Sequence, residues 1–323
     1  MARPKLLLTR RIPQAAEERL AAAYDLTIHP HDRPMTVAEW LQALPLYDAV
    51  CPNASDRIDA AVLGAGELRV RILANYGAGL DHIDLTAAQA AGIAVTNTPG
   101  AVTEPTADLT LMLMLMASRR ASEGERELRS DQWAGWRPTH MIGQSLSGKL
   151  LGLVGFGRIA QAVAHRAKAG FGMRIAYYSR NRAAPDIEAR FEARYVASLD
   201  ALAAQADILS LHTPGGAQTR HLINAERLAA MKPSAILINT ARGTVVDEQA
   251  LAEALTARRI AAAGLDVFER EPVVHAALMG LQNVVLLPHL GSATIEARTQ
   301  MGMQAADNLD AFFAGQTPPD RVV

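Results

Sequence analysis

The chain has 323 residues, half of them hydrophobic, with 32 basic residues against 33 acidic ones and a formal net charge of -1 at pH 7. This balance gives no indication of nucleic acid or an anionic membrane as a partner, and the single cysteine, Cys51, excludes an intrachain disulfide framework. The length exceeds that of one usual hydrophobic core, so two domains are expected. The first residues contain only a three-leucine run, too short for a signal-peptide core, which favours a cytoplasmic protein.

The first hundred residues contain short apolar runs that are typical of strands, and Ala-rich helical stretches such as 13–23 lie between several of them. The runs are Lys5–Thr9, Leu26–His29, Asp48–Cys51, Val70–Asn75 and Ile93–Thr96. The polar turn 75–84 follows the fourth run, and its Gly77 and Gly79 could expose backbone N–H groups to an anion. A tight strand-to-helix connection explains the same turn equally well.

The breaker cluster Asn97–Gly100 predicts the crossing into a second domain. A buried helix is expected to begin near Glu104 and to include the apolar stretch 109–117, which is much shorter than the roughly 20 residues that span a membrane. The basic pair 119–120 suits the last turn of this helix. The following segment, 122–141, shows no clean period.

The strongest local motif is the run LLGLV followed by GFGRIA, where a strand meets three small residues and opens into a helix. Gly155 permits the tight turn, Gly157 allows the backbone to approach a pyrophosphate, and Ala160 takes the third small position. The N–H groups of Arg158 and Ile159 would face the phosphates at the positive end of the helix dipole. An ordinary glycine turn remains compatible with the motif by itself, but the regular strand and helix signals that follow favour a dinucleotide site.

Further apolar runs after this motif predict buried parallel strands, separated in most cases by helices. The runs are Arg174–Tyr178, Ile208–His212, Ala235–Asn239, Ala263–Val267 and Val284–Leu287, and the expected helix N-caps are Ser198, Asn224 and Asp247. An amphipathic helix over Ile295–Phe313 would pack back on the first domain. The expected fold class is α/β with two doubly wound domains: a Rossmann domain, residues 100–288, is inserted in a smaller flavodoxin-like domain, residues 1–99 and 289–323. The cleft is expected between them.

Several ordered motifs resemble those of the D-2-hydroxyacid dehydrogenases, over almost the whole chain. They are Asn75–Asp84, Gly155–Ala160, Met231–Gly243, Gly264–Pro272 and Pro288–Ala293. Within this family the chain looks most similar to the glyoxylate and hydroxypyruvate reductases. The resemblance implies a nicotinamide cofactor and a homodimer formed through the nucleotide domains.

The resemblance also implies a catalytic triad of Arg242, Glu271 and His289. The planar fork of Arg242 suits the carboxylate beside the reacting carbonyl of a 2-oxo acid. Hydride arriving at the carbonyl carbon leaves negative charge on the oxygen, and His289 is the candidate proton donor. Glu271 would bond the far ring nitrogen of His289 and favour its protonated form. Outside the motifs, His289 would more often be structural and Glu271 would more often be a solvated loop acid.

Other contacts follow from the same resemblance. The candidate cofactor contacts are Thr213, Pro214, Thr240, Ala241, Asp266 and Gly291, and the candidate substrate contacts are Asn75, Ala78, Gly79, Arg242 and, from the partner subunit, Trp136. Asp266 resembles the residue that takes the nicotinamide carboxamide. A buried acid at that place without a partner would be costly, which favours a ligand or hydrogen-bonding role.

Cofactor choice is predicted by the residues about 20 positions beyond the glycines, where NAD-binding proteins need a carboxylate. This chain has Ser179, Arg180, Asn181 and Arg182 there, and no acid before Asp186. Two guanidinium groups and a hydroxyl suit a 2′-phosphate, and one charge-assisted hydrogen bond contributes roughly 1.5–3 kcal/mol. NADP(H) is therefore expected, with a solvated basic turn as the alternative.

The sequence thus predicts an NADPH-dependent reductase of glyoxylate or hydroxypyruvate. The alternatives are a reductase of a larger 2-oxo acid such as phenylpyruvate, and a nucleotide-sensing binding protein. No metal is expected.

Overall fold

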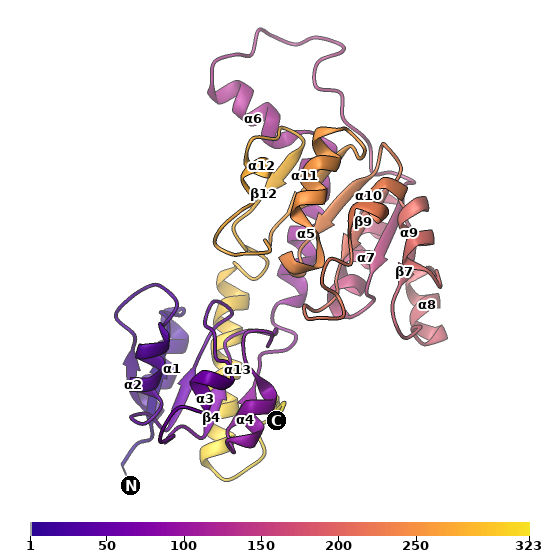
Figure 1. The fold of residues 1–323 in the computed structure, drawn as a ribbon. Helices are drawn as coiled ribbons and strands as arrows, with labels where there is room; N and C mark the ends of the chain where they lie inside the picture. The colour runs from indigo at the N-terminus through magenta and orange to yellow at the C-terminus, as the bar shows by residue number, and fades with distance from the viewer. Residues whose placement is uncertain (1) are drawn as a thin grey trace. The chain divides into compact units, whose positions relative to one another are not determined.

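The computed structural model describes residues 2–323, which divide into two compact units (Figure 1). Unit 1 comprises the residues up to Val102 together with Ser292–Val323, and unit 2 comprises Thr103–Gly291. These bounds lie three residues after the predicted crossings at 99/100 and 288/289. Both units are parallel sheets with helices packed on both faces, so the predicted doubly wound α/β fold class is confirmed.

Unit 1 has a five-stranded sheet in the order β2-β1-β3-β4-β5, which is the flavodoxin-like order. Its strands are β1 (Lys5–Leu8), β2 (Asp25–Ile28), β3 (Ala49–Cys51), β4 (Ile72–Ala74) and β5 (Ala94–Thr96), and its helices are α1 (Gln14–Ala23), α2 (Val37–Ala43), α3 (Ala60–Leu63), α4 (Leu85–Ala90) and α13 (Ile295–Phe313). Leu20 of α1 and Leu309 of α13 pack on one face of the sheet. Trp40 of α2 and Val62 of α3 pack on the other.

Unit 2 has a seven-stranded sheet in the order β12-β11-β10-β9-β6-β7-β8, with the Rossmann reversal at β6 and β9. Its strands are β6 (Leu150–Val154), β7 (Arg174–Tyr178), β8 (Ala193–Tyr195), β9 (Ile208–Leu211), β10 (Ile236–Asn239), β11 (Ala262–Leu265) and β12 (Val284–Leu286). Its helices are α5 (Thr103–Ser118), α6 (Ala121–Arg129), α7 (Arg158–Phe171), α8 (Pro185–Phe191), α9 (Leu199–Gln205), α10 (Ala225–Ala230), α11 (Glu248–Thr256) and α12 (Ala276–Met279). The buried leucines of α9, α10 and α11 cover one face, and α5 and α7 cover the other.

The predicted strands coincide with observed ones to within two residues at each end, and Ser198, Asn224 and Asp247 are N-caps as expected. The prediction for the end of α5 is wrong. This helix ends at Ser118, before the basic pair, because Arg120 takes a left-handed conformation with φ 55° and starts a new helix, α6. Strand β8 was not predicted either.

The last residues of the chain pair with the edge of the unit 1 sheet. The N–H of Val322 donates to the carbonyl of Val95 at 2.8 Å, and the N–H of Val95 donates to the carbonyl of Val323 at 3.2 Å. Beside this pairing, the buried side chain of Asn308 on α13 donates to Asp320 at 3.0 Å. The tail is therefore an integral part of unit 1.

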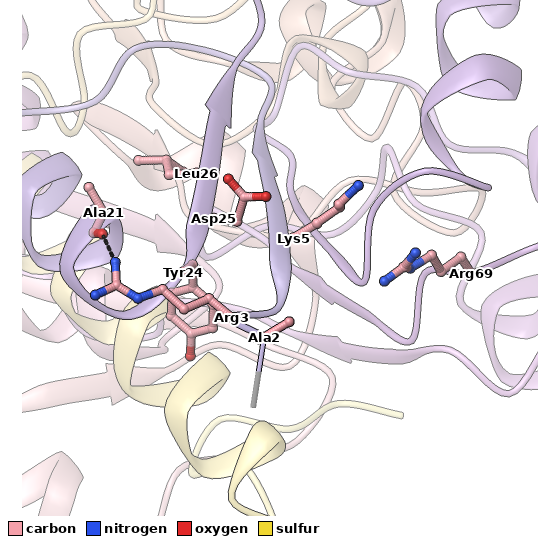
Figure 2. A pocket seen from close by; sticks show the side chains of 8 residues that line it. All are labelled: Ala2, Arg3, Lys5, Ala21, Tyr24, Asp25, Leu26 and Arg69. Carbon is pink, nitrogen blue, oxygen red and sulfur yellow. Dashed lines mark hydrogen bonds between the residues drawn. The ribbon is translucent and has the colours of Figure 1, made fainter.

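Two surface cavities lie at the amino ends of the strands. The larger, about 550 Å³, is lined in unit 1 by the first residues of β1 and β2, Lys5 and Asp25, together with Arg3 and Arg69. Figure 2 shows these side chains around the opening. Open parallel sheets bind their ligands at the carboxyl ends of the strands, so this cavity is not the candidate active site. None of the helices formed by residues 2–323 combines the length and apolar character needed to cross a bilayer.

Candidate active site

The turn after β6 contains two glycines, and each position needs glycine for a different reason. Gly155 has φ +89°, and a Cβ there would lie 2.6 Å from the carbonyl oxygen of His212, so the chain itself requires glycine. Gly157 has an ordinary φ of -77°, and apart from its two chain neighbours no heavy atom of residues 2–323 lies within 4 Å of a Cβ built there. The fold leaves room at Gly157 that a side chain would fill, as expected for a cradle that backbone and pyrophosphate share.

The start of α7 offers donors beside this cradle. Gly157 is the N-cap residue of α7, and within the described chain no side chain caps the helix. The N–H groups of Arg158 and Ile159, in the first turn of α7, therefore remain available to an anion. Ala160 is fully buried against the sheet, as its predicted packing role requires.

Thr213 adds a second indication of a ligand at the same turn. Its Oγ1 is buried and has no hydrogen-bond partner among residues 2–323, and its methyl carbon lies 3.4 Å from the Cβ position of Gly155. A buried hydroxyl without a partner is costly, so a bound group is the natural partner. The neighbouring His212 bonds Ser210 at 2.9 Å, and burial lowers its pKa to about 3, so this ring stays neutral. These features fit a dinucleotide.

At the end of β7, the predicted phosphate-binding residues have different partners. The hydroxyl of Ser179 donates to the carbonyl of Asn181, and Nη1 of Arg180 donates to the side-chain oxygen of Gln218 at 2.8 Å. Arg182 makes two hydrogen bonds to Glu188, at 2.9 and 2.8 Å. Arg180 is thus held by a neutral group and Arg182 by a carboxylate that sequence reasoning missed.

Unit 2 brings the three predicted catalytic residues together. Nδ1 of His289 lies 2.7 Å from Oε2 of Glu271, whose other oxygen accepts from the N–H of Phe268 at 2.9 Å. The hydrogen bond to Glu271 raises the pKa of His289, against the opposing effect of burial. Burial disfavours ionisation of Glu271, but the bonds from His289 and Phe268 outweigh it and lower the pKa of that carboxyl. The charge of Arg242 lowers both pKa values, so all three groups interact.

The backbone around Arg242 is fixed from both sides. The side chain of Asn239 accepts from the N–H of Ala241 at 3.0 Å and donates to the carbonyl of Arg242 at 2.9 Å. A Cβ on Gly243 would lie 1.8 Å from the carbonyl carbon of Phe268, so only glycine permits this close approach. The turn that carries Arg242 is therefore pressed against the segment that holds Glu271.

Asp266 orders the turn that carries His289. Its two carboxylate oxygens accept from the N–H groups of Leu290 and Gly291 at 2.7 and 2.8 Å, and its own carbonyl accepts from the N–H of His289 at 2.9 Å. Burial raises the pKa of Asp266, while these two backbone bonds lower it. The carboxylate of Asp266 thus has protein partners, which explain its burial without a ligand. Its contact with a nicotinamide stays a prediction. His289 itself has φ 55°, a conformation that this bonding supports.

In unit 1, the loop after β4 turns its carbonyl groups toward asparagine side chains. Asn75 is buried and donates to the carbonyls of Gly77 and Gly79 at 2.9 and 3.0 Å, and Asn97 donates to the carbonyl of Ala78 at 2.8 Å. Among the described residues, the N–H groups of Ala78 and Gly79 have no acceptor. Asn75, predicted as a substrate contact, uses its amide to shape the loop, and the free donors are the neighbouring N–H groups.

The remaining predicted contacts lie on the same strand ends or on the surface. Oγ1 of Thr240 already bonds Oγ1 of Thr110 at 2.9 Å, and the carbonyl of Pro214 accepts from Thr219 at 2.8 Å. Trp136 is 81% exposed. No group of three or more potential metal ligands occurs among the side chains of residues 2–323.

Comparisons with known proteins show the family to which the chain belongs. Residues 111–291 match the family described as "D-isomer specific 2-hydroxyacid dehydrogenase, NAD binding domain". The chain is 44% identical to the glyoxylate reductase of Thermococcus litoralis, over 99% of this chain and 97% of that protein. It is 38% identical to the glycerate dehydrogenase of Hyphomicrobium methylovorum, over 98% of each.

A solved structure of similar fold is the NADPH-dependent glyoxylate/hydroxypyruvate reductase from Sinorhizobium meliloti in complex with NADP and malonate. It has a TM-score of 0.88 and 35% identity, with 100% of this chain and 97% of that chain covered. The protein is therefore an oxidoreductase with a Rossmann-type NAD-binding domain. It belongs to the D-2-hydroxyacid dehydrogenase family.

Proposed function

We propose that the protein is an NADPH-dependent reductase that converts glyoxylate to glycolate and hydroxypyruvate to D-glycerate. The observation that carries the proposal is the Glu271–His289 pair, 2.7 Å apart, beside Arg242. The names of the similar proteins, glyoxylate reductase and glycerate dehydrogenase, support a small 2-oxo acid as substrate.

Each residue of the site has a separate role in the proposed reaction. The guanidinium of Arg242 binds the substrate carboxylate. In unit 1, the N–H groups of Ala78 and Gly79 are proposed substrate contacts. The bound nicotinamide cofactor supplies the hydride. Nε2 of His289, which has no hydrogen-bond partner among residues 2–323, gives a proton to the carbonyl oxygen. Glu271 accepts a hydrogen bond from the other ring nitrogen and, by raising the pKa of His289, favours the protonated imidazole.

The preference for NADPH rests on the turn after β7. Ser179 and Arg180 lie where an NAD-binding protein carries an acid, and among residues 2–323 the side-chain partner of Arg180 is the neutral Gln218. Arg180 is thus available to a 2′-phosphate, with Arg182 nearby in the same turn. A solved relative that is NADPH-dependent and contains NADP supports the same choice.

We also propose a cytoplasmic homodimer formed by unit 2. A cavity of about 430 Å³ is lined by the end of α5, the start of α6 and the amino ends of β10–β12. Three apolar side chains on α6 and in the segment after it are exposed: Leu128, Trp136 and Ile142 are 62%, 81% and 66% exposed, and Ile142 lines the cavity. A second copy would cover this surface, and Trp136 would reach its substrate site. A monomer by light scattering, or a Trp136→Ala variant with unchanged kinetic constants, would contradict this proposal.

The catalytic proposal is tested by initial rates of NADPH and NADH oxidation with glyoxylate, hydroxypyruvate and phenylpyruvate. We expect NADPH with a small 2-oxo acid to be fastest and His289→Gln to lose turnover by about 10²–10⁴-fold. His165→Gln, an exposed histidine on α7, is the matched control. Faster phenylpyruvate reduction would favour the larger-substrate alternative, and no turnover at all would favour the nucleotide-sensing binding protein.

A further inference from the structure

The guanidinium of Arg182 already makes several contacts within the protein. Its Nε and Nη2 both bond Glu188, at 2.9 and 2.8 Å, and its guanidinium lies 5.5 Å from the ring centre of Tyr195 on β8. A guanidinium that uses two donors in one planar fork has only its remaining N–H groups for another anion. Two donors of Arg182 are therefore already used by Glu188 when a phosphate binds.

Glu188 is itself fixed in place. Its Oε1 also accepts from the hydroxyl of Tyr177 at 2.5 Å, and only 13% of its side chain is exposed. The ring of Tyr177 stacks on Phe156, the residue between the two glycines of the turn, with centroids 4.2 Å apart. The hydrogen bonds from Arg182 and Tyr177 lower the pKa of Glu188 to about 2, so it is ionised at any physiological pH. The negative charge of Glu188 is thus a fixed part of this turn.

The two arginines of this turn consequently have different electrostatic surroundings. The charge of Glu188 offsets that of Arg182, so the pair presents no net positive charge to a phosphate. Within the described chain, Arg180 is held by the neutral amide of Gln218. Building on the proposed NADPH dependence, we propose that Glu188 is a specificity-determining residue that engages Arg182 and limits its contribution, so that recognition of the 2′-phosphate rests mainly on Arg180 and Ser179.

The test measures binding of adenosine 2′,5′-bisphosphate and of 5′-AMP by calorimetry, which isolates the 2′-phosphate without turnover. Glu188→Gln keeps an acceptor for Tyr177 and removes the charge. We expect it to tighten the bisphosphate about three- to tenfold and to leave 5′-AMP unchanged, because a freed arginine contributes one more charge-assisted bond at a largely exposed site. In the Arg182→Ala background the same substitution should give a gain of less than about twofold.

A second comparison needs only the arginine variants, should Glu188→Gln fold poorly. Arg180→Ala should weaken the bisphosphate at least tenfold, and Arg182→Ala by no more than about threefold. Glu125→Gln, which breaks the exposed Glu125–Arg129 pair on α6, is the matched control for loss of one surface charge. It should alter neither ligand.

Weaker bisphosphate binding by Glu188→Gln would overturn the inference, since it would mean that Glu188 orients Arg182 for the phosphate. Equal losses in the two arginine variants would overturn it as well. Failure of the NADPH proposal gives a separate result: the parent protein would then bind 5′-AMP and the bisphosphate equally, or prefer NADH in turnover.

Discussion

The glycine pair after β6 gives the sharpest test of how this turn serves a ligand. We expect Gly155→Ala to destabilise the protein and Gly157→Ala to leave it folded but unable to bind cofactor well. An alanine at φ +89° costs roughly 1–2 kcal/mol, and its overlap with the main chain of His212, at 2.6 Å, adds about 1–3 kcal/mol. At Gly157 no such neighbour exists among residues 2–323, and replacing a glycine N-cap with alanine costs at most about 1 kcal/mol.

Thermal unfolding and a fluorescence titration with NADPH separate the two effects. At roughly 2–4 °C per kcal/mol for a unit of this size, Gly155→Ala should lower Tm by about 5–15 °C and Gly157→Ala by no more than about 4 °C. The added methyl of Gly157→Ala should weaken NADPH at least tenfold. Parental affinity for NADPH in folded Gly157→Ala would refute the assignment of this space to the pyrophosphate.

Three further substitutions test the remaining parts of the site. The hydrogen bond to Glu271, together with its charge, raises the pKa of His289, so the active imidazolium is present below that pKa and is lost as pH rises through it. Glu271→Gln should therefore slow reduction by about 10–100-fold near neutral pH and move the falling limb of the pH–rate profile to lower pH. An unmoved limb would contradict the pairing. Asn97→Ala removes from the loop after β4 a hydrogen bond that contributes about 1 kcal/mol. It should raise KM for the 2-oxo acid about fivefold and leave the KM for NADPH unchanged. A change in the KM for NADPH alone would be inconsistent with this reasoning. Gly243→Ala should destabilise unit 2 by more than about 3 kcal/mol in urea unfolding, because the backbone of Phe268 occupies the place of the added Cβ. Gly280→Ala is the control, because a Cβ there meets open space among the described residues.

Features governed by local chemistry could be predicted from the sequence. Apolar runs bounded by turns identify buried strands, and a residue such as Ser198 or Asp247 caps a helix through its own next turn. The fold class follows because parallel strands need crossover helices. The contact of Glu271 with His289 was expected from the family motifs, and the structure contains it.

Features that depend on distant partners could not be predicted. Helix α6 was missed because its sequence, ASEGERELR, has Leu128 as its one large apolar residue, so it shows no repeat of apolar residues at helical spacing. Glu188 was overlooked because it lies on a helix beyond the turn, and only the folded chain brings it to Arg182. Asp266 suggested a ligand because its backbone partners, 24 and 25 residues further along, could not be known in advance.

The discontinuity of unit 1 has a consequence for the order in which the protein folds during synthesis. Leu6 and Leu8 of β1 are made first, yet their core includes Ala306 and Leu309 of α13, which leave the ribosome only after the whole of unit 2. Unit 2 is one continuous segment, so all its core residues are available before α13 exists. We therefore expect the second unit along the chain to close first, while the nascent first sheet keeps part of one hydrophobic face, beside α1, uncovered until its final helix arrives.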